Sequence, residues 1–245
     1  MKGLQKRLKH KVRLYAKSIR RSIAGALPYK LYKLLSPFVH FVDMLIFDHL
    51  FVRLLFPNRH KISERAWRSA QPLPFQLQQT KKLGIRTVIN LRGNANSTTY
   101  RLEQKSCKEL GINYVDYKLR SRAAPTQEEL LGLRNLFKNV EYPILLHCKS
   151  GADRAGLASA LFLYWVEGVP LEFARHQLSL RYGHVRQADT GLLDVFLEEY
   201  LTHAANDSID LMTWAGRYYN PEQLKIKFKS KGWANRFLYG LLRRE

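Results

Sequence analysis

The chain has 245 residues, of which 46% are hydrophobic and 12% aromatic. This length and composition can bury a sizeable core, which excludes a disordered chain and a small disulfide-stabilised scaffold. The formal net charge is +21 and is concentrated at the two ends. Residues 1–42 hold eleven Lys or Arg and no acid, and residues 220–245 hold seven against two acids. We therefore expect a nearly neutral domain with basic segments that bind an anionic partner.

The N-terminal segment has the pattern of a basic amphipathic helix. One face of such a helix carries the apolar residues Leu4, Leu8, Val12, Tyr15, Ile19 and Ile23, and the other face carries lysines and arginines. This pattern favours binding in the plane of an anionic membrane. Packing of the apolar stripe on the domain is the alternative. Nucleic acid is a disfavoured partner because aromatic residues do not alternate with the basic ones.

No membrane-spanning helix and no secretory signal are expected. The apolar stretch 31–56 is interrupted by Lys33, Asp43, Asp48 and Arg53. The two cysteines are too few for a disulfide framework, which favours a reducing compartment. We expect a cytoplasmic protein held peripherally at the inner face of a membrane through residues 1–56. A mitochondrial location is the alternative for a eukaryotic source, because the basic start also fits a transit peptide.

Beyond residue 62 the pattern changes to strands that alternate with helices, which predicts an α/β domain with a central, mostly parallel sheet flanked by helices. The expected strands cover residues 86–91, 112–119 and 142–146, and the expected helices cover 75–83, 126–140 and 157–168, with further helices to about 201. Thr126 suits the N-cap of its helix, and the two acids that follow suit the helix dipole.

These patterns divide the chain into three parts. Residues 1–60 form a basic helical extension, 61–205 the α/β domain, and 206–245 a basic aromatic extension. We expect both extensions to be helical.

The third strand runs directly into the sequence His147-Cys148-Lys149-Ser150-Gly151-Ala152-Asp153-Arg154-Ala155-Gly156. In an open α/β sheet ligands bind outside the carboxyl ends of the strands, and a glycine-bearing loop that opens a helix presents backbone N–H groups to an anion. The helix N-terminus and nearby positive charge favour a Cys148 thiolate, which can attack phosphorus. Arg154 offers a planar guanidinium fork to phosphate oxygens at the same point. The spacing thus predicts phosphoryl chemistry.

This segment resembles the phosphate-binding loop of the cysteine-dependent protein tyrosine and dual-specificity phosphatases, in which His-Cys is followed by five residues and Arg. The resemblance covers roughly residues 63–200 and includes Trp67-Arg68-Ser69-Ala70-Gln71-Pro72 and Gly84-Ile85-Arg86-Thr87-Val88-Ile89-Asn90-Leu91-Arg92-Gly93, which are similar to bacterial and fungal dual-specificity-like members. It implies a phosphotyrosine-phosphatase-like fold.

The resemblance also implies the roles of the loop residues. Cys148 is the nucleophile that forms a phosphocysteine, and Arg154 binds the phosphate. The backbone amides of Lys149, Ser150, Gly151 and Ala152, continuing to Arg154, cradle the phosphate, and His147 orients the loop and favours the thiolate. No metal and no cofactor is implied.

The general acid, which protonates the leaving oxygen, departs from the usual pattern. Relatives carry an aspartate in a mobile loop about thirty residues before the cysteine. Asp116 has that distance but falls inside the expected strand 112–119, so Asp153 in the phosphate-binding loop is the better candidate. A third alternative is that Asp153 braces the loop and water supplies the proton.

Ala155 is a second departure, because most members carry Ser or Thr there, whose hydroxyl helps to release the thiolate. A phosphate-binding pseudophosphatase that acts as an adaptor is therefore a rival to an active enzyme. For an enzyme, the basic ends favour a membrane lipid or lipid-linked phosphate as substrate, and a phosphoprotein is the alternative. Lys149, Arg120, Arg122 and the segment 181–187 are candidates for the pocket wall, with ordinary surface positions as the alternative. The sequence leaves the oligomeric state open.

Overall fold

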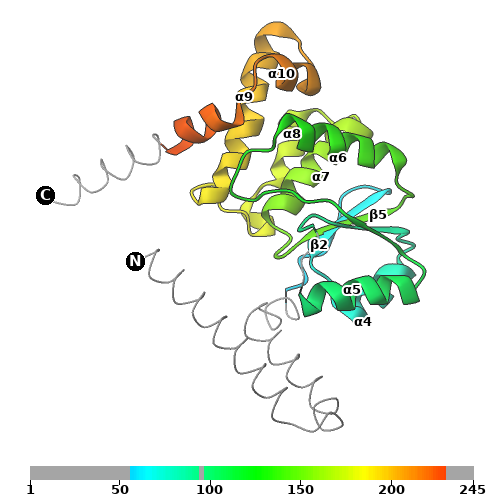
Figure 1. The fold of residues 1–245 in the computed structure, drawn as a ribbon. Helices are drawn as coiled ribbons and strands as arrows, with labels where there is room; N and C mark the ends of the chain where they lie inside the picture. Colours follow the sequence, from blue (N-terminus) through cyan, green and yellow to red (C-terminus); the bar gives the residue numbers. More distant parts are fainter. Residues whose placement is uncertain (1–55, 94–96, 230–245) are drawn as a thin grey trace, which may run out of the picture. The chain divides into compact units, whose positions relative to one another are not determined.

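A computed structural model describes residues 56–93 and 97–229. These residues form one five-stranded sheet between two layers of helices (Figure 1). The strands are β1 (His60–Lys61), β2 (Ala66–Ala70), β3 (Thr87–Asn90), β4 (Asn113–Asp116) and β5 (Ile144–Cys148), and their order is β1-β2-β5-β3-β4. β1 pairs with β2 in antiparallel fashion, and all other neighbours are parallel. This confirms the predicted α/β class with a mostly parallel sheet.

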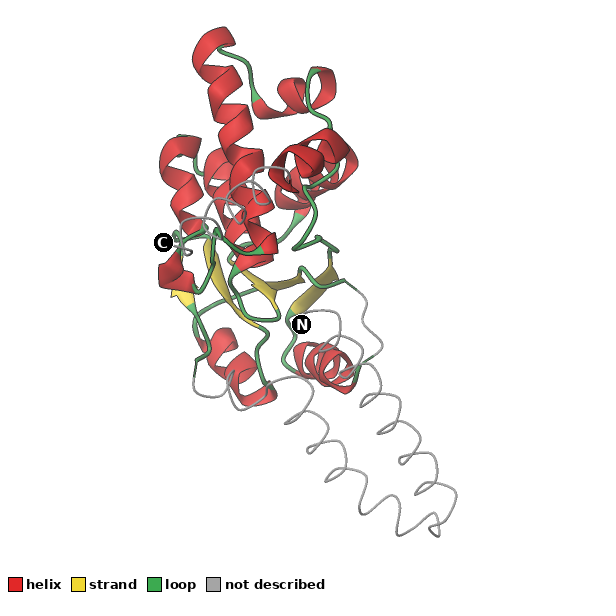
Figure 2. Ribbon diagram, turned by 90° about the vertical axis from the view of Figure 1, so that its left-hand side faces the viewer, coloured by secondary structure: helices red, strands yellow, loops and turns green. Residues whose placement is uncertain are grey.

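Helices cover both faces of the sheet (Figure 2). One face carries α4 (Pro74–Lys82) and α5 (Thr98–Glu109), and the other carries α6 (Gln127–Asn139), α7 (Asp153–Val166), α8 (Leu171–Ala174), α9 (Leu192–Asp207) and α10 (Leu211–Arg217). Residues 221–229 form a last helical segment. No helix among the described residues is long and apolar enough to cross a membrane.

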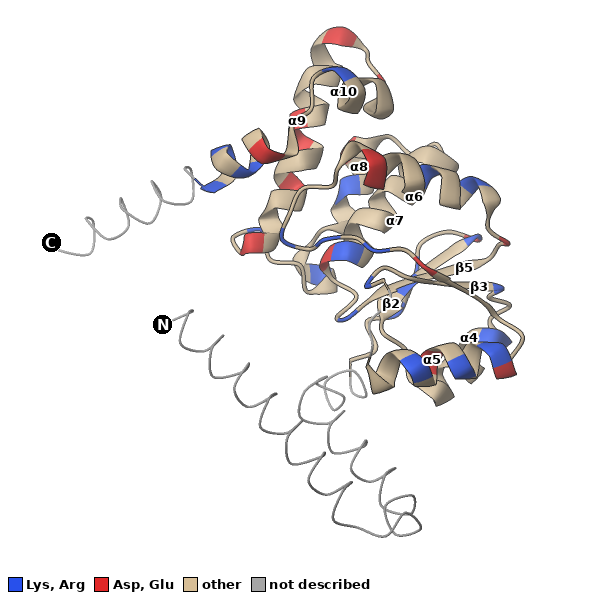
Figure 3. Ribbon diagram, in the orientation of Figure 1, with Lys and Arg blue, Asp and Glu red and all other residues tan. Residues whose placement is uncertain are grey.

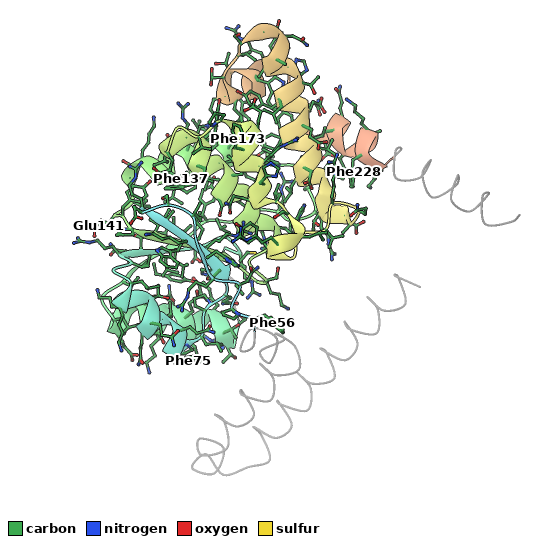
Figure 4. The ribbon with its side chains drawn as sticks, turned by 180° about the vertical axis from the view of Figure 1, so that it is seen from behind. Phe56, Phe75, Phe137, Glu141, Phe173 and Phe228 are labelled. Atoms are coloured by element: carbon green, nitrogen blue, oxygen red, sulfur yellow. The ribbon has the colours of Figure 1, made fainter. Side chains whose placement is uncertain are left out.

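The buried strands explain why two cores form. Side chains alternate between the two faces of a strand. Val88 and Leu145 therefore join the small core under α4 and α5, whereas Ile89 and Leu146 join the large core under α6, α7 and α9. In Figure 4, Phe75 marks the first helical layer and Phe137 the second. A parallel sheet covered on both faces explains the continuous apolar pattern of β3 and β5.

Two elements differ from the sequence prediction. Helix α7 begins at Asp153, four residues before the expected start, so Asp153 and Arg154 lie in its first turn. Helix α5 was not predicted, because the stripe that it buries consists of Thr99, Tyr100, Glu103 and Cys107 and has no aliphatic periodicity. By contrast, Thr126 caps α6 as expected, since its side chain accepts a hydrogen bond from the Glu129 amide.

The packing continues beyond residue 205, where the sequence analysis placed the end of the domain. Leu211, Trp214 and Leu224 are buried in the large core. The Trp214 ring also contacts Phe196 and Tyr200 of α9, so α10 belongs to the domain. The predicted amphipathic helix within residues 1–25, and the C-terminal aromatic residues from Trp233 on, lie outside the described residues.

Candidate active site

The carboxyl ends of four strands meet at one edge of the sheet. Cys148 at the end of β5 pairs with Ala70 of β2, and its neighbour His147 pairs with Asn90 of β3, which in turn pairs with Asp116 of β4. The loops that follow β3, β4 and β5 therefore converge there. They line a cavity of about 520 Å³ that is open to solvent, and its polar lining includes Arg92, Lys118, Arg120, Arg122, Asp153 and Arg154.

Cys148 and Arg154 stand at the two ends of the loop 148–154. Cys148 is the last residue of β5 and is 2% exposed. Arg154 lies in the first turn of α7 and lines the cavity, and its Nε atom is buried. The N-terminus of α7 directs its free backbone amides and positive dipole end toward this loop. The strand, loop and helix that the sequence predicted are thus present as one unit.

Arg68 of β2 holds the loop from the buried side. Its Nη2 donates to the carbonyl oxygens of Gly151 (2.6 Å) and Ala152 (3.1 Å), and its Nη1 donates to the carbonyl oxygen of Gln177 (2.6 Å). The C=O and N–H of a trans peptide point in opposite directions, so the amides of Ala152 and Asp153 are directed away from Arg68. The guanidinium also stacks over the Tyr182 ring at 3.9 Å. Burial lowers the pKa of Arg68 to about 10, and the nearby Cys148 and Asp153 oppose this shift.

Gly151 is required at the turn of the loop for two reasons. Its φ of +74° is strained for other residues, and a Cβ there would lie 2.6 Å from the backbone nitrogen of Ala70. Asn58 adds a second restraint, because its Nδ2 donates to the carbonyl oxygens of Ser150 and Tyr182, both at 2.9 Å. The loop is therefore fixed against β2 before any ligand binds.

A buried polar chain extends from His147 to the cavity. Nε2 of His147 lies 2.7 Å from Oε1 of Glu103, and both side chains are almost completely buried. The other carboxylate oxygen of Glu103 accepts from Nε2 of Gln71 at 2.7 Å. The side-chain oxygen Oε1 of Gln71 accepts from Nη1 of Arg92, which lines the cavity. Glu103 on α5 thus lies between His147, the residue before Cys148, and the Gln71–Arg92 pair at the cavity wall.

Asp153 faces the cavity and also contacts a buried histidine. Oδ1 of Asp153 lies 2.8 Å from Nδ1 of His184, and Nε2 of His184 lies 2.7 Å from Oδ2 of Asp194 on α9. Burial alone would lower the pKa of His184, but the hydrogen bonds to Asp153 and Asp194 outweigh it and raise the pKa to about 9. His184 is therefore an imidazolium at neutral pH that bridges the two carboxylates.

Asp116 has a different environment. Its carboxylate accepts hydrogen bonds from Nδ2 of Asn90 and from the Tyr100 hydroxyl. Among the described residues, the cavity is lined by Asp153 and not by Asp116. The geometry thus brings Asp153, rather than Asp116, to the same cavity as Arg154.

The other candidate residues are divided between the cavity and its surroundings. Arg120 and Arg122 line the cavity, so of the two alternatives that the sequence left open, pocket wall or ordinary surface, the structure shows the first. Lys149 is partly exposed outside the cavity lining, and its carbonyl oxygen accepts from the Gln71 amide at 3.4 Å. Within segment 181–187, Tyr182 stacks on Arg68 and His184 contacts Asp153. Both residues therefore support the loop from its buried side, outside the cavity lining. The described residues contain no cluster of three or more His, Cys, Asp or Glu that could hold a metal ion.

Sequence reasoning missed the roles of Arg68, Glu103 and His184. Arg68 lies inside the segment 67–72 that carried the family resemblance, yet its partners are more than eighty positions away in sequence. Glu103 belongs to the unpredicted helix α5. His184 lies in a segment that was considered only as pocket wall. For Arg68 the available signal was a charged residue inside the short segment Ala66–Ala70, which otherwise holds small and aromatic residues.

Residues 58–189 match the family described as DSP-PTPase phosphatase fused to NAD+ kinase, and this match covers more than half of the chain. The chain belongs to this phosphatase family. The loop 148–154 is accordingly called the phosphate loop below. A search among curated proteins gives no match.

Solved structures that are similar to this chain at low sequence identity include those of TpbA, Tk-PTP and PTPMT1. TpbA of P. aeruginosa is 21% identical, with a TM-score of 0.48 over 61% of this chain and 91% of its own. The active form of Tk-PTP is 24% identical, with a TM-score of 0.46 over 58% and 97%. PTPMT1 is 20% identical, with a TM-score of 0.45 over 61% and 99%.

Proposed function

We propose that this phosphatase hydrolyses the phosphomonoester of a membrane lipid or lipid-linked molecule through a phosphocysteine intermediate. The observation that carries the proposal is the shared cavity of Asp153 and Arg154, with Cys148 at the start of the same fixed loop. Phosphoryl transfer needs positioning and electrostatic stabilisation more than any other contribution. The pre-positioned amides and the guanidinium supply both.

In the first step the Cys148 thiolate attacks phosphorus, the S–P bond forms, and the bond to the leaving oxygen breaks. Asp153 enters this step as the carboxylic acid, protonated on the oxygen that does not contact His184, and donates that proton to the leaving oxygen, so an alcohol departs. In the second step water attacks the phosphocysteine, Asp153 takes one proton from it, and the S–P bond breaks to release inorganic phosphate and the thiolate. Arg154 binds the equatorial phosphate oxygens in both steps.

The charge distribution along the chain is the reason for proposing a lipid substrate. The basic N-terminal segment and the cationic cavity both favour an anionic surface with phosphorylated headgroups. A protein held there, peripherally on the inner face of a membrane, keeps its active site next to lipid phosphates. A phosphoprotein substrate remains the second candidate, because the same phosphate loop binds any phosphomonoester.

A substrate panel tests the proposal. Phosphopeptides, phosphoinositides, phosphatidylglycerophosphate and lipid A phosphates are incubated with the wild type and with the Cys148→Ser and Arg154→Ala variants. We expect phosphate release from a lipid phosphate and loss of release in both variants, with unchanged circular dichroism. If phosphate is released faster from phosphopeptides than from every lipid, the substrate is a phosphoprotein and the lipid proposal is wrong.

Burst kinetics separate an enzyme from a phosphate-binding adaptor. Ala155 lacks the hydroxyl that helps to release the thiolate, so we expect the phosphocysteine to accumulate and an aryl phosphate to give a burst of one alcohol per protein. An adaptor would bind phosphate and give no burst. Activity should also be lost to mild peroxide and regained with a thiol, because the thiolate is the reactive species.

A further inference from the structure

The cavity at the phosphate loop holds more positive charge than one phosphate group requires. Arg154 and the loop amides account for the phosphate that is removed. Arg120 is neutralised by Glu129, which it contacts twice at 3.1 Å, and Asp153 faces the His184 imidazolium. Lys118 and Arg122 have no carboxylate partner in the described part of the chain, although both line the cavity.

Lys118 is held at the cavity by the backbone around it. The amides of Tyr117 and Leu119 donate to the carbonyl oxygens of Asn90 (3.0 Å) and Leu91 (3.1 Å), so the loop after β4 continues alongside the loop after β3. Leu119 is buried in the large core. Since side chains alternate along an extended segment, Lys118 points to the opposite side. A Cβ on Gly93 would lie 2.7 Å from the Cβ of Lys118, so only glycine permits this approach.

Arg122 lies at the tip of a short, braced turn. Arg120 donates to Glu129 at the start of α6 and to the carbonyl oxygen of Ala124 at 3.3 Å, which closes the turn around Arg122. The buried Ala124 and the hydrogen bond from the Tyr219 hydroxyl to the Pro125 carbonyl oxygen fix its far side. Figure 3 shows blue Lys and Arg segments along the loops at this end of the sheet.

We infer that Lys118 and Arg122 form a second anion site, which binds an additional phosphate group of the substrate while Arg154 binds the phosphate that is removed. This inference rests on the proposed function and narrows its substrate class to phosphomonoesters with a second phosphate. A cavity of about 520 Å³ has room for both groups. The second phosphate can belong to a lipid headgroup or to a soluble molecule, since the site recognises the same dianion in both.

The test compares monophosphate and bisphosphate esters of ethanediol, propanediol and butanediol. The ratio of kcat/KM for each bisphosphate to that for the matching monophosphate is measured in the wild type, in Lys118→Gln, in Arg122→Gln and in the double variant. Lys138→Gln, which removes an exposed charge of α6 outside the cavity, is the matched control. We expect at least one bisphosphate to be preferred about tenfold or more, which is the size of one charge-assisted hydrogen bond.

The preference should fall in each single variant, disappear in the double variant and persist in Lys138→Gln. Vesicles with a bisphosphorylated lipid, compared with vesicles of the matching monophosphorylated lipid, then show whether the lipid form is used. Equal kcat/KM for bisphosphates and monophosphates, or a preference that survives in the double variant, would overturn the second site.

Binding separates a failure of this inference from a failure of the proposed function. If the wild type hydrolyses none of the esters, the proposed function fails. The second site still stands if the Cys148→Ser protein binds a bisphosphate about tenfold more tightly than the monophosphate by calorimetry, and if Lys118→Gln with Arg122→Gln removes that difference. Equal binding of both esters by the Cys148→Ser protein overturns it.

Discussion

The side chain of Asp153 lies between a buried histidine and the cavity. Its Oδ1 contacts His184, and the side chain also lines the cavity, where we propose that it protonates the leaving oxygen. His184 therefore acts as a positioning residue that fixes the direction of Asp153. The contact leaves the second carboxyl oxygen of Asp153 available for the reaction.

If Asp153 is the general acid, the effect of Asp153→Asn depends on the leaving group. We expect kcat for an alkyl phosphate to fall about 100-fold, whereas an activated aryl phosphate, which hardly needs protonation, loses only a few-fold. Steady-state kinetics on a series of leaving groups measures this dependence. Asp116→Asn is the matched control, because Asp116 keeps its carboxylate outside the cavity lining. The assignment is wrong if Asp116→Asn shows the leaving-group dependence and Asp153→Asn does not.

His184 makes stability depend on pH at the residue scale. Its pKa is raised to about 9 in the folded protein from an ordinary 6.5, so the folded state holds the proton more tightly. The resulting stabilisation is fully present below pH 6.5 and is lost as the pH rises through about 9. It is on the order of 3 kcal/mol.

Urea unfolding at a series of pH values measures this contribution. We expect the free energy of unfolding of the wild type to decline between neutral pH and pH 9, and the His184→Gln variant to lack most of this decline. A wild-type stability that stays constant across that window would contradict the bridge between Asp153 and Asp194.

At the scale of elements, the phosphate loop depends on β2 as much as on its own strand β5. Arg68 is wholly buried beneath the loop and donates to two of its carbonyl groups. Gly151 packs directly on the backbone of Ser69 and Ala70. The unit that we propose to bind phosphate thus consists of two parallel strands, a loop and a helix.

We expect Arg68→Lys to reduce both stability and activity, although it keeps the charge. Lysine cannot donate from two planar nitrogens to Gly151, Ala152 and Gln177 together, so buried carbonyl groups lose their partners at a cost of about 2–4 kcal/mol. Unfolding by urea and kcat on an aryl phosphate are the measurements. Arg65→Lys, which alters an exposed pair with Glu167, is the control and should change little. Similar effects of the two variants would argue against the role of Arg68.

At the scale of the whole molecule, the basic ends and the catalytic domain are separate in sequence. The stripe from Leu4 to Ile23 can bury apolar side chains in the interfacial region of a membrane, and each nearby basic residue adds about 1 kcal/mol of attraction to anionic lipid. We expect the full chain to sediment with anionic liposomes more than with neutral ones. Salt or deletion of residues 1–25 should weaken this binding.

Two single substitutions that add the same charge separate the apolar stripe from simple charge attraction. Val12→Asp places the carboxylate on the stripe, and His10→Asp places it on the opposite face of the predicted helix. We expect Val12→Asp to reduce sedimentation strongly and His10→Asp to reduce it slightly. If deletion of residues 1–25 leaves liposome binding and lipid hydrolysis unchanged, the proposed membrane association and the proposed lipid substrate both fail.

The sequence by itself determined the features that depend on local pattern. Apolar runs predicted β3 and β5 within a few residues, and Thr126 together with the two acids that follow it predicted the start of α6. The phosphate loop was evident because its cysteine, glycine and arginine lie within seven consecutive residues. Such features are local, so one stretch of sequence contains all the residues that make them.

Only the tertiary structure decided which distant residues support that loop. Arg68, Glu103 and His184 come from a strand, a helix and a loop that are widely separated in sequence. Each is a polar residue buried by tertiary packing, and its partners lie on other elements. The period of hydrophobic residues carries no signal for a buried polar group, because the free energy of such a group depends on partners that the fold alone brings within hydrogen-bonding distance. The convergence of Arg92, Lys118 and Arg122 on one cavity follows from the strand order in the same way.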